Sequence, residues 1–268
     1  MKKVLGLLIA LMMTTQAFAS IAVAPTKVEI NANKIKSNYV TTAVEVRGDS
    51  KQAIRFRVYP GYFKINSNGE MNMEAKSDEY DISKKVRFVP SEFNVMPGKT
   101  QKVRINIAGI SSLPDGESRA VLYLEDVNPK EFALNTGMQG IGAQLIVKTR
   151  VGVPIYVDKG KVVKKGDIES FNIINDKKGQ YTEIKVVSSG NSKIRCNGKA
   201  QIIQGKKLIH EYKLQEFVVG DNNSITVKDK IDTGKISEKG TYTLRVVISY
   251  TDENGKKQNL KQEKEINI

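Results

Sequence analysis

The chain has 268 residues and a formal net charge of +14, with one histidine and one cysteine. A single cysteine excludes an intramolecular disulfide, and a single histidine excludes a metal site built on several histidines. The basic residues are scattered among acidic ones and form no block, so we expect a solvated basic surface and no nucleic-acid partner.

Residues 1–19 have the pattern of a secretory signal peptide. Two lysines after the first methionine precede an apolar run from Val4 to Met13, and the sequence AFA that ends at Ala19 offers a small-residue cleavage site. The apolar run is shorter than the roughly 20 residues that a membrane-spanning helix needs. We therefore expect cleavage after Ala19, export from the cytoplasm, and no membrane span in the mature chain.

Residues 20–158 read as a series of short β-strands. Examples are VTTAVEVR, TQKVRINIAG and SRAVLYLEDV, in which apolar residues alternate with polar ones. Turn sequences such as Asn66–Gly69, Pro97-Gly98 and Pro114–Gly116 separate the strands. About seven strands at this spacing are typical of an immunoglobulin-like sandwich.

Residues 159–268 predict a second β-sandwich domain. A short polar connector, residues 158–161, precedes a second series of strand patterns, which includes YTEIKVVSS and TYTLRVVISYTD. Glu253-Asn254-Gly255 is a good hairpin turn, and no segment has a convincing amphipathic helical pattern. We therefore expect an all-β protein of two immunoglobulin-like β-sandwich domains.

The segment between the two series is an unusually long alternating stretch. From Ile141 to Val157 the odd positions are almost all apolar, while even positions include Gln144, Lys148 and Arg150. At about 3.3 Å per residue the stretch would extend about 55 Å, whereas strands in globular proteins usually end after about 5–6 residues. Either it is one very long central strand, or part of its apolar row is covered by something outside the domain.

The sequence offers no constellation that would support catalysis. It contains no G-x-S-x-G, P-loop or dinucleotide-binding motif. His210 lies in a strand pattern, and Cys196 is flanked by no zinc-type spacing, so both are interpreted as structural residues. By elimination we predict a binding or assembly protein that is not an enzyme and needs no cofactor or metal.

Four segments of the N-terminal half resemble PapD-like periplasmic pilus chaperones, in the same order and spacing. They are APTKVEI, RFVPSEFNVMPGKTQKVRI, LPDGESRAVLYLEDV and LIVKTRVGVPIYV. The C-terminal half is similar only in being a second all-β domain. The resemblance is to a divergent branch, near the archaic spore-coat-type chaperones.

The resemblance implies a fold and a function. Its members are two immunoglobulin-like domains in an L or boomerang, located in the periplasm. They bind pilus or fimbrial subunits by lending an edge strand, here about residues 141–150, and deliver them to an outer-membrane usher. It assigns the donated row to Ile141, Ala143, Leu145 and Val147. Val151, Val153 and Ile155 would then belong to the chaperone's own core, with a bend at Gly152 and Pro154.

The resemblance also implies two cations that bind the subunit's terminal carboxylate. Lys27 in PTK matches the first, and Arg150 is the nearest cation for the second, because the usual position falls at Gly152. Tyr156 stands where an arginine partner for Glu117 is expected.

A second hypothesis stays open from the sequence. A secreted adhesive or structural protein with two immunoglobulin-like modules would use its basic surface to bind a polymer or a host molecule. A periplasmic pull-down separates the two hypotheses, because a chaperone captures small β-rich subunits in near-equal amounts.

Overall fold

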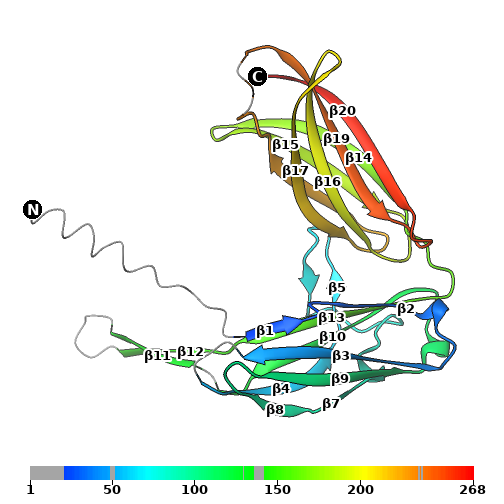
Figure 1. Cartoon of the computed structure of the whole chain (residues 1–268), viewed down its shortest axis with the longest axis vertical. Helices are drawn as coiled ribbons and strands as arrows, with labels where there is room; N and C mark the ends of the chain where they lie inside the picture. The colour runs from blue at the N-terminus through cyan, green and yellow to red at the C-terminus, as the bar shows by residue number, and fades with distance from the viewer. Residues whose placement is uncertain (1–20, 49–51, 129, 136–141, 235, 237) are drawn as a thin grey trace, which may run out of the picture.

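A computed structural model describes residues 21–48, 52–128, 130–135, 142–234, 236 and 238–268. The predicted signal peptide and Ile141 lie outside these residues. The regular secondary structure of the described residues is nearly all β-strand, with three short 3-10 helices, η1 (Ala32–Lys34), η2 (Ser83–Lys85) and η3 (Ile110–Ser112). Its strands form two bodies that meet at an angle, as Figure 1 shows. The predicted class, two β-sandwich domains in an L, is confirmed.

The first body packs a four-stranded sheet, in the order β1-β3-β9-β7, against a five-stranded sheet, in the order β2-β13-β10-β4-β8. Two small hairpins, β5-β6 and β11-β12, are added to this sandwich. The bounds of its strands are β1 (Ile21–Ala24), β2 (Val28–Asn31), β3 (Tyr39–Gly48), β4 (Ile54–Gly61), β5 (Lys64–Ile65), β6 (Met71–Asn72), β7 (Val86–Val89), β8 (Glu92–Val95), β9 (Thr100–Ala108), β10 (Gly116–Asp126), β11 (Lys130–Asn135), β12 (Gly142–Val147) and β13 (Arg150–Lys159).

The second body packs a three-stranded sheet, in the order β14-β15-β18, against a four-stranded sheet, in the order β17-β16-β19-β20. Its core is apolar and includes Cys196, Ile202 and Leu244, all fully buried. The bounds of its strands are β14 (Gly166–Asp176), β15 (Gly179–Ser188), β16 (Ile194–Gln204), β17 (Lys207–Val219), β18 (Ser224–Lys230), β19 (Thr241–Thr251) and β20 (Lys257–Asn267).

The N-terminal segment contributes to both sheets of the first body. β1 pairs antiparallel with β3, and β2 pairs parallel with β13. Pro25 lies between the two strands, where its missing N–H removes no ladder hydrogen bond. This switch puts Lys27 immediately before the edge strand β2 of the five-stranded sheet.

The long alternating stretch is two strands and not one. β12 ends at Val147 and β13 begins at Arg150. The predicted bend at Gly152 and Pro154 is wrong, because both residues lie inside β13 in regular register with β10. The change of partner explains the break: β13 pairs with β10 inside the sandwich, whereas β12 pairs with β11 beyond it.

The apolar row of β13 belongs to the core, as predicted. Val153, Ile155 and Val157 are at most 1% exposed and lie between the two sheets, with Val151 packed against the same core. Because side chains alternate along a strand, Arg150, Gly152, Pro154 and Tyr156 lie on the opposite, outer face of the sheet.

Candidate functional site

The β11-β12 hairpin extends away from the sandwich, as Figure 1 shows. Among the described residues β12 pairs only with β11, so its other edge presents unpaired backbone groups. At its end Ile146 is 56% and Val147 39% exposed. An apolar strand with a free edge invites pairing with another chain unless a partner covers it.

The predicted donated row lies partly within this hairpin. Val147, the last residue of the predicted row, is exposed. Ile146 lies on the other side of the strand. The side chains of Ala143 and Leu145, like Ile141, lie outside the part of the chain that the structure describes, so the row remains a prediction.

Arg150 lies at the start of β13 over an aromatic pair. Its guanidinium carbon is 4.4 Å from the centre of the Tyr123 ring, and Nη1 is 3.4 Å from the Tyr59 hydroxyl. The Tyr59 hydroxyl donates a hydrogen bond of 2.6 Å to Glu125. Such stacking is favourable for a guanidinium, and the side chain remains exposed to a ligand.

Lys27 lies on the same outer face, farther along the sheet. Val28 is buried in the core and pairs with Ile155 of β13 in a parallel ladder. Lys27, one residue before Val28, is therefore level with Pro154 along the sheet. Pro154 is four residues from Arg150, which corresponds to about 13 Å along a strand. Lys27 and Arg150, the two predicted anchor cations, therefore lie on the same face of the sheet but at different positions along its strands.

Glu117 lies at the junction of the two bodies in a buried ionic network. The resemblance implies an arginine partner for Glu117 at position 156, where this chain has Tyr156, and other cations pair with Glu117 instead. Arg119 Nε donates to Glu117 Oε1 at 2.9 Å, and Lys193 Nζ donates to Oε2 at 2.7 Å. Arg119 also contacts Asp221 of the second body. Glu117 and Arg119 are 1% and 4% exposed, and Lys193 is 6% exposed.

Tyr156 contributes to this junction through its aromatic ring, whereas an arginine would contribute an ion pair. Lys193 Nζ lies 3.4 Å from the centre of the Tyr156 ring, and Phe63 meets the ring edge-on. Burial raises the pKa of Tyr156 to about 12, and the nearby Glu117 carboxylate acts in the same direction. The Tyr156 ring is therefore uncharged and packs over Lys193, the lysine of the second domain that pairs with Glu117 of the first.

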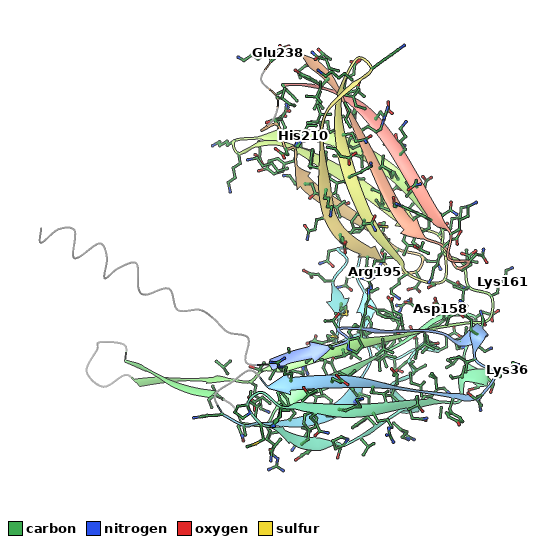
Figure 2. The ribbon with its side chains drawn as sticks, in the orientation of Figure 1. Lys36, Asp158, Lys161, Arg195, His210 and Glu238 are labelled. Carbon is green, nitrogen blue, oxygen red and sulfur yellow. The ribbon has the colours of Figure 1, made fainter. Side chains whose placement is uncertain are left out.

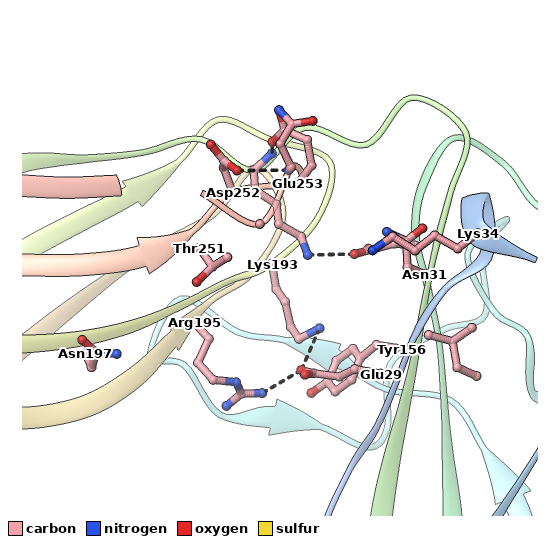
Figure 3. A pocket seen from close by; sticks show the side chains of 15 residues that line it. Glu29, Asn31, Lys34, Tyr156, Lys193, Arg195, Asn197, Thr251, Asp252 and Glu253 are labelled. Carbon is pink, nitrogen blue, oxygen red and sulfur yellow. Dashed lines mark hydrogen bonds and ion pairs between the residues drawn. The ribbon is translucent and has the colours of Figure 1, made fainter. Parts of the chain in front are cut away.

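A cavity of about 690 Å³ opens beside this junction, between β2, η1 and β13 of the first body and the β16 and β19-β20 ends of the second. Figure 3 shows Lys193 and Arg195 reaching Glu29 across it. Figure 2 places Arg195 and Asp158 where the domains meet, and His210 far out in the second domain. Sequence reasoning missed this cluster, because Arg195 and Glu29 are 166 residues apart.

Glu29 is the shared carboxylate of that cluster. Its Oε1 accepts from Arg195 Nη2 at 3.2 Å and is 3.5 Å from Lys193 Nζ, while Oε2 is 3.9 Å from Lys27 Nζ. Partial burial alone would raise the pKa of Glu29, but Lys193, Lys27 and Arg195 outweigh it and hold the pKa below its ordinary value.

The remaining candidate residues have structural surroundings. Cys196 is fully buried, and burial raises the pKa of its thiol to about 12. His210 Nε2 lies 2.9 Å from Asp232 in the second body. No group of three or more histidine, cysteine, aspartate or glutamate residues could hold a metal ion within the described ranges. None of the helices there is long and apolar enough to cross a membrane.

Three solved structures illustrate what the chain is similar to. The class 5 fimbriae chaperone CfaA is 16% identical over 91% of this chain and 98% of its own, with a TM-score of 0.46. The CupB2 chaperone of Pseudomonas aeruginosa is 11% identical over 90% and 98%, with a TM-score of 0.46.

The third structure is the CsuC-CsuE chaperone and tip-subunit complex of archaic Csu pili from Acinetobacter baumannii, 17% identical over 91% and 98%, with a TM-score of 0.44. No family model and no curated protein matches the chain. Two of these three structures are described as chaperones of fimbriae or pili, and the other as a chaperone.

Proposed function

We propose that this chain is a periplasmic chaperone that binds pilus or fimbrial subunits along β12 and delivers them to an outer-membrane usher. The observation that carries the proposal is the β11-β12 hairpin, which leaves one edge of β12 unpaired among the described residues and ends in the exposed Ile146 and Val147. The mechanism needs no nucleotide, metal or covalent step.

Strand addition would use both properties of this edge. The free N–H and C=O groups of β12 supply hydrogen bonds to an incoming strand, and alternate side chains supply the fit. The proposed contacts are Ile141, Ala143, Leu145 and Val147. At about 25 cal/mol per Å² of apolar surface, burial of four such side chains contributes several kcal/mol of binding free energy.

The break after Val147 separates the strand proposed to bind subunits, β12, from the strand that forms part of the chaperone's own core, β13. The core residues Val153, Ile155 and Val157 are covered whether or not a subunit is present. A subunit can therefore take and release the hairpin edge while the sandwich stays folded.

Lys27 and Arg150 are the proposed anchor for a subunit's terminal carboxylate. Both are cations on the outer face of the five-stranded sheet, and each could donate charge-assisted hydrogen bonds to an anion there. Their different levels mean that their long side chains must converge on the ligand.

The strand is tested by substituting neighbouring residues on opposite sides of β12. A tagged chain is recovered from periplasm of its source cells, and the bound proteins are quantified by mass spectrometry. We expect small β-rich subunits in near-equal amount to the wild-type chain. Leu145→Glu and Val147→Glu should abolish their capture, because an unpaired charge buried in an apolar groove costs several kcal/mol.

Ile146→Glu is the matched control, since it places the same charge on the other side of the same strand and should retain capture. Thermal melting checks that each variant remains folded. Equal loss at all three positions, or capture retained by Val147→Glu, would contradict strand donation. Binding to a polymer without an equimolar subunit would favour the adhesive alternative.

A further inference from the structure

The outer face of the sheet β1-β3-β9-β7 is cationic. The inward apolar residues of β3 and β9 pack in the core, so the alternate positions face solvent. Arg87, Lys102 and Arg104 occupy such outward positions. Among the outward positions that the structure describes on these four strands, the only carboxylate is Glu45, whose Oε1 is 3.2 Å from Lys102 Nζ. Arg87 and Arg104 form no ion pair with any described residue.

Two lysines extend this face at the end of β7. Lys84 and Lys85 of η2 immediately precede the strand, and Lys85 Nζ donates a 3.0 Å hydrogen bond to Ser112. Arg87 Nη1 donates to the carbonyl of Lys84 at 2.9 Å, which keeps the guanidinium beside η2 while its other N–H groups have no partner among the described residues. The cationic face thus consists of Lys84, Lys85, Arg87, Lys102 and Arg104.

A cavity of about 550 Å³ opens at the edge of the cationic face, between β7, η2 and β4. Lys84 and Arg87 line it together with the hydroxyl groups of Ser83 and Ser91 and the apolar ring of Phe88. None of its lining residues is a carboxylate. Two cations and two hydroxyl groups supply many hydrogen-bond donors, and phosphate oxygens are the acceptors that a guanidinium binds through two N–H groups at once.

The arrangement fits an extended anionic surface better than one small anion. The five cations are spread over a sheet face and its edge, whereas two of them line the cavity. Val89 and Tyr39 point outward on the same face and are 59% and 56% exposed. Apolar and aromatic side chains beside cations are typical of proteins that lie at a bilayer interface.

The cationic face is open in the full chain. The second domain contacts the first through Tyr156 on the five-stranded sheet, which is the other side of the sandwich. Figure 1 shows β7 and β9 on the side of the first body away from the second. A flat partner can therefore approach the cationic face without meeting the second domain.

We propose that the cationic face binds a membrane that contains anionic phospholipids. Lys84 and Arg87 bind a headgroup phosphate in the cavity, the other three cations attract neighbouring headgroups, and Tyr39 and Val89 contact the interfacial layer. Each cation near an anionic bilayer adds attraction, and five of them act together. The proposal goes beyond subunit capture and does not depend on strand donation; its consequence would be a higher concentration of the chain at the membrane surface.

The test is co-sedimentation of the exported chain with vesicles in about 0.1 M salt. Vesicles of phosphatidylcholine with about a quarter phosphatidylglycerol are compared with vesicles of phosphatidylcholine alone. We expect binding to the anionic vesicles only, and its loss when the salt is raised, because screening weakens exposed charges. The double variant Lys84→Gln/Arg87→Gln should bind about ten- to thirtyfold more weakly, and Arg104→Gln about fivefold more weakly.

Lys206→Gln/Lys207→Gln is the matched control, because it removes the same charge from an exposed turn of the second domain and should change binding less than about twofold. Melting curves check that each variant is folded. Glycerol 3-phosphate at the concentration of the lipid phosphate should not displace the chain, since it offers one phosphate to a face that binds several. Equal binding to both kinds of vesicle, binding to neither, equal losses in the control, or displacement by glycerol 3-phosphate would overturn the proposal.

Discussion

Replacement of Glu117 by glutamine should uncouple the two domains. Gln keeps the size of the side chain but removes the charge that joins Arg119 to Lys193. Removing one partner of a buried ion pair typically costs about 3–5 kcal/mol. Arg119 retains Asp221, and Lys193 retains Glu29 at 3.5 Å, so we expect the lower end, about 3 kcal/mol.

Scanning calorimetry of the full chain at pH 7 measures this loss. For a protein of this size 1 kcal/mol corresponds to roughly 2–4 °C, so the melting temperature should fall by roughly 6–12 °C. Because the contact joins two domains, the unfolding peak should also separate into two transitions. Lys193→Met should lose a similar amount, and the double variant should lose less than the sum of the two.

Glu92→Gln is the control for a carboxylate that is paired but exposed. Glu92 accepts from Arg55 at 2.7 Å and from Arg57 at 3.0 Å on the surface of the first body, and its loss should leave the melting curve unchanged. A Glu117→Gln protein that melts with the wild type, or strictly additive losses in the double variant, would refute the coupling.

Three further results are expected. Lys27→Ala, Arg150→Ala and Arg150→Met should each weaken subunit capture by about 2–5 kcal/mol, whereas Lys206→Ala at an exposed turn should not; small equal effects at all sites would refute the anchor. Cys196→Ser should lower the free energy of unfolding by about 1–3 kcal/mol and leave capture unchanged, and loss of capture at an unchanged melting temperature would reveal a reactive thiol. Because the pKa of Glu29 is lowered, its ion pairs stabilise the chain fully above the ordinary carboxyl pKa, about 4.3, and this stabilisation is lost as the pH falls through the lowered pKa. The stability advantage of wild type over Glu29→Gln in urea unfolding should therefore begin to decline at about pH 4.3 and keep declining in more acidic solution, and a constant advantage from pH 7 to 3 would contradict this.

The period-two pattern predicts the sandwich core well, because burial of one face is a local property of a strand. Val153, Ile155 and Val157 lie in the core for that reason. The same pattern conceals the break at residues 148–149, since Thr149 continues the alternation while the hydrogen-bond partner changes from β11 to β10.

The ionic junction could not be predicted in the same way. The partner of Glu117 was expected at position 156, but the arginine comes from position 119 on the same strand, and Lys193 comes from the other domain. Glu117 and Lys193 are 76 residues apart, and no local pattern links such positions. The predicted anchor shares this limit, because a common face can be inferred from alternation but the level along the sheet depends on register.

The small β5-β6 hairpin stands between the two bodies in Figure 1. Asn223 donates a 2.9 Å hydrogen bond to the carbonyl of Ile65, and Val218 packs on the same apolar cluster as Ile65 and Tyr123. Together with the ion pair between Lys193 and Glu117, this gives the two domains a second, separate contact. Two separate contacts between the domains oppose hinge motion, so the angle between the domains is fixed before any partner binds. A subunit that spans both arms would then lose less entropy on association than with a hinged pair, because rigidity is already present in one of the two partners.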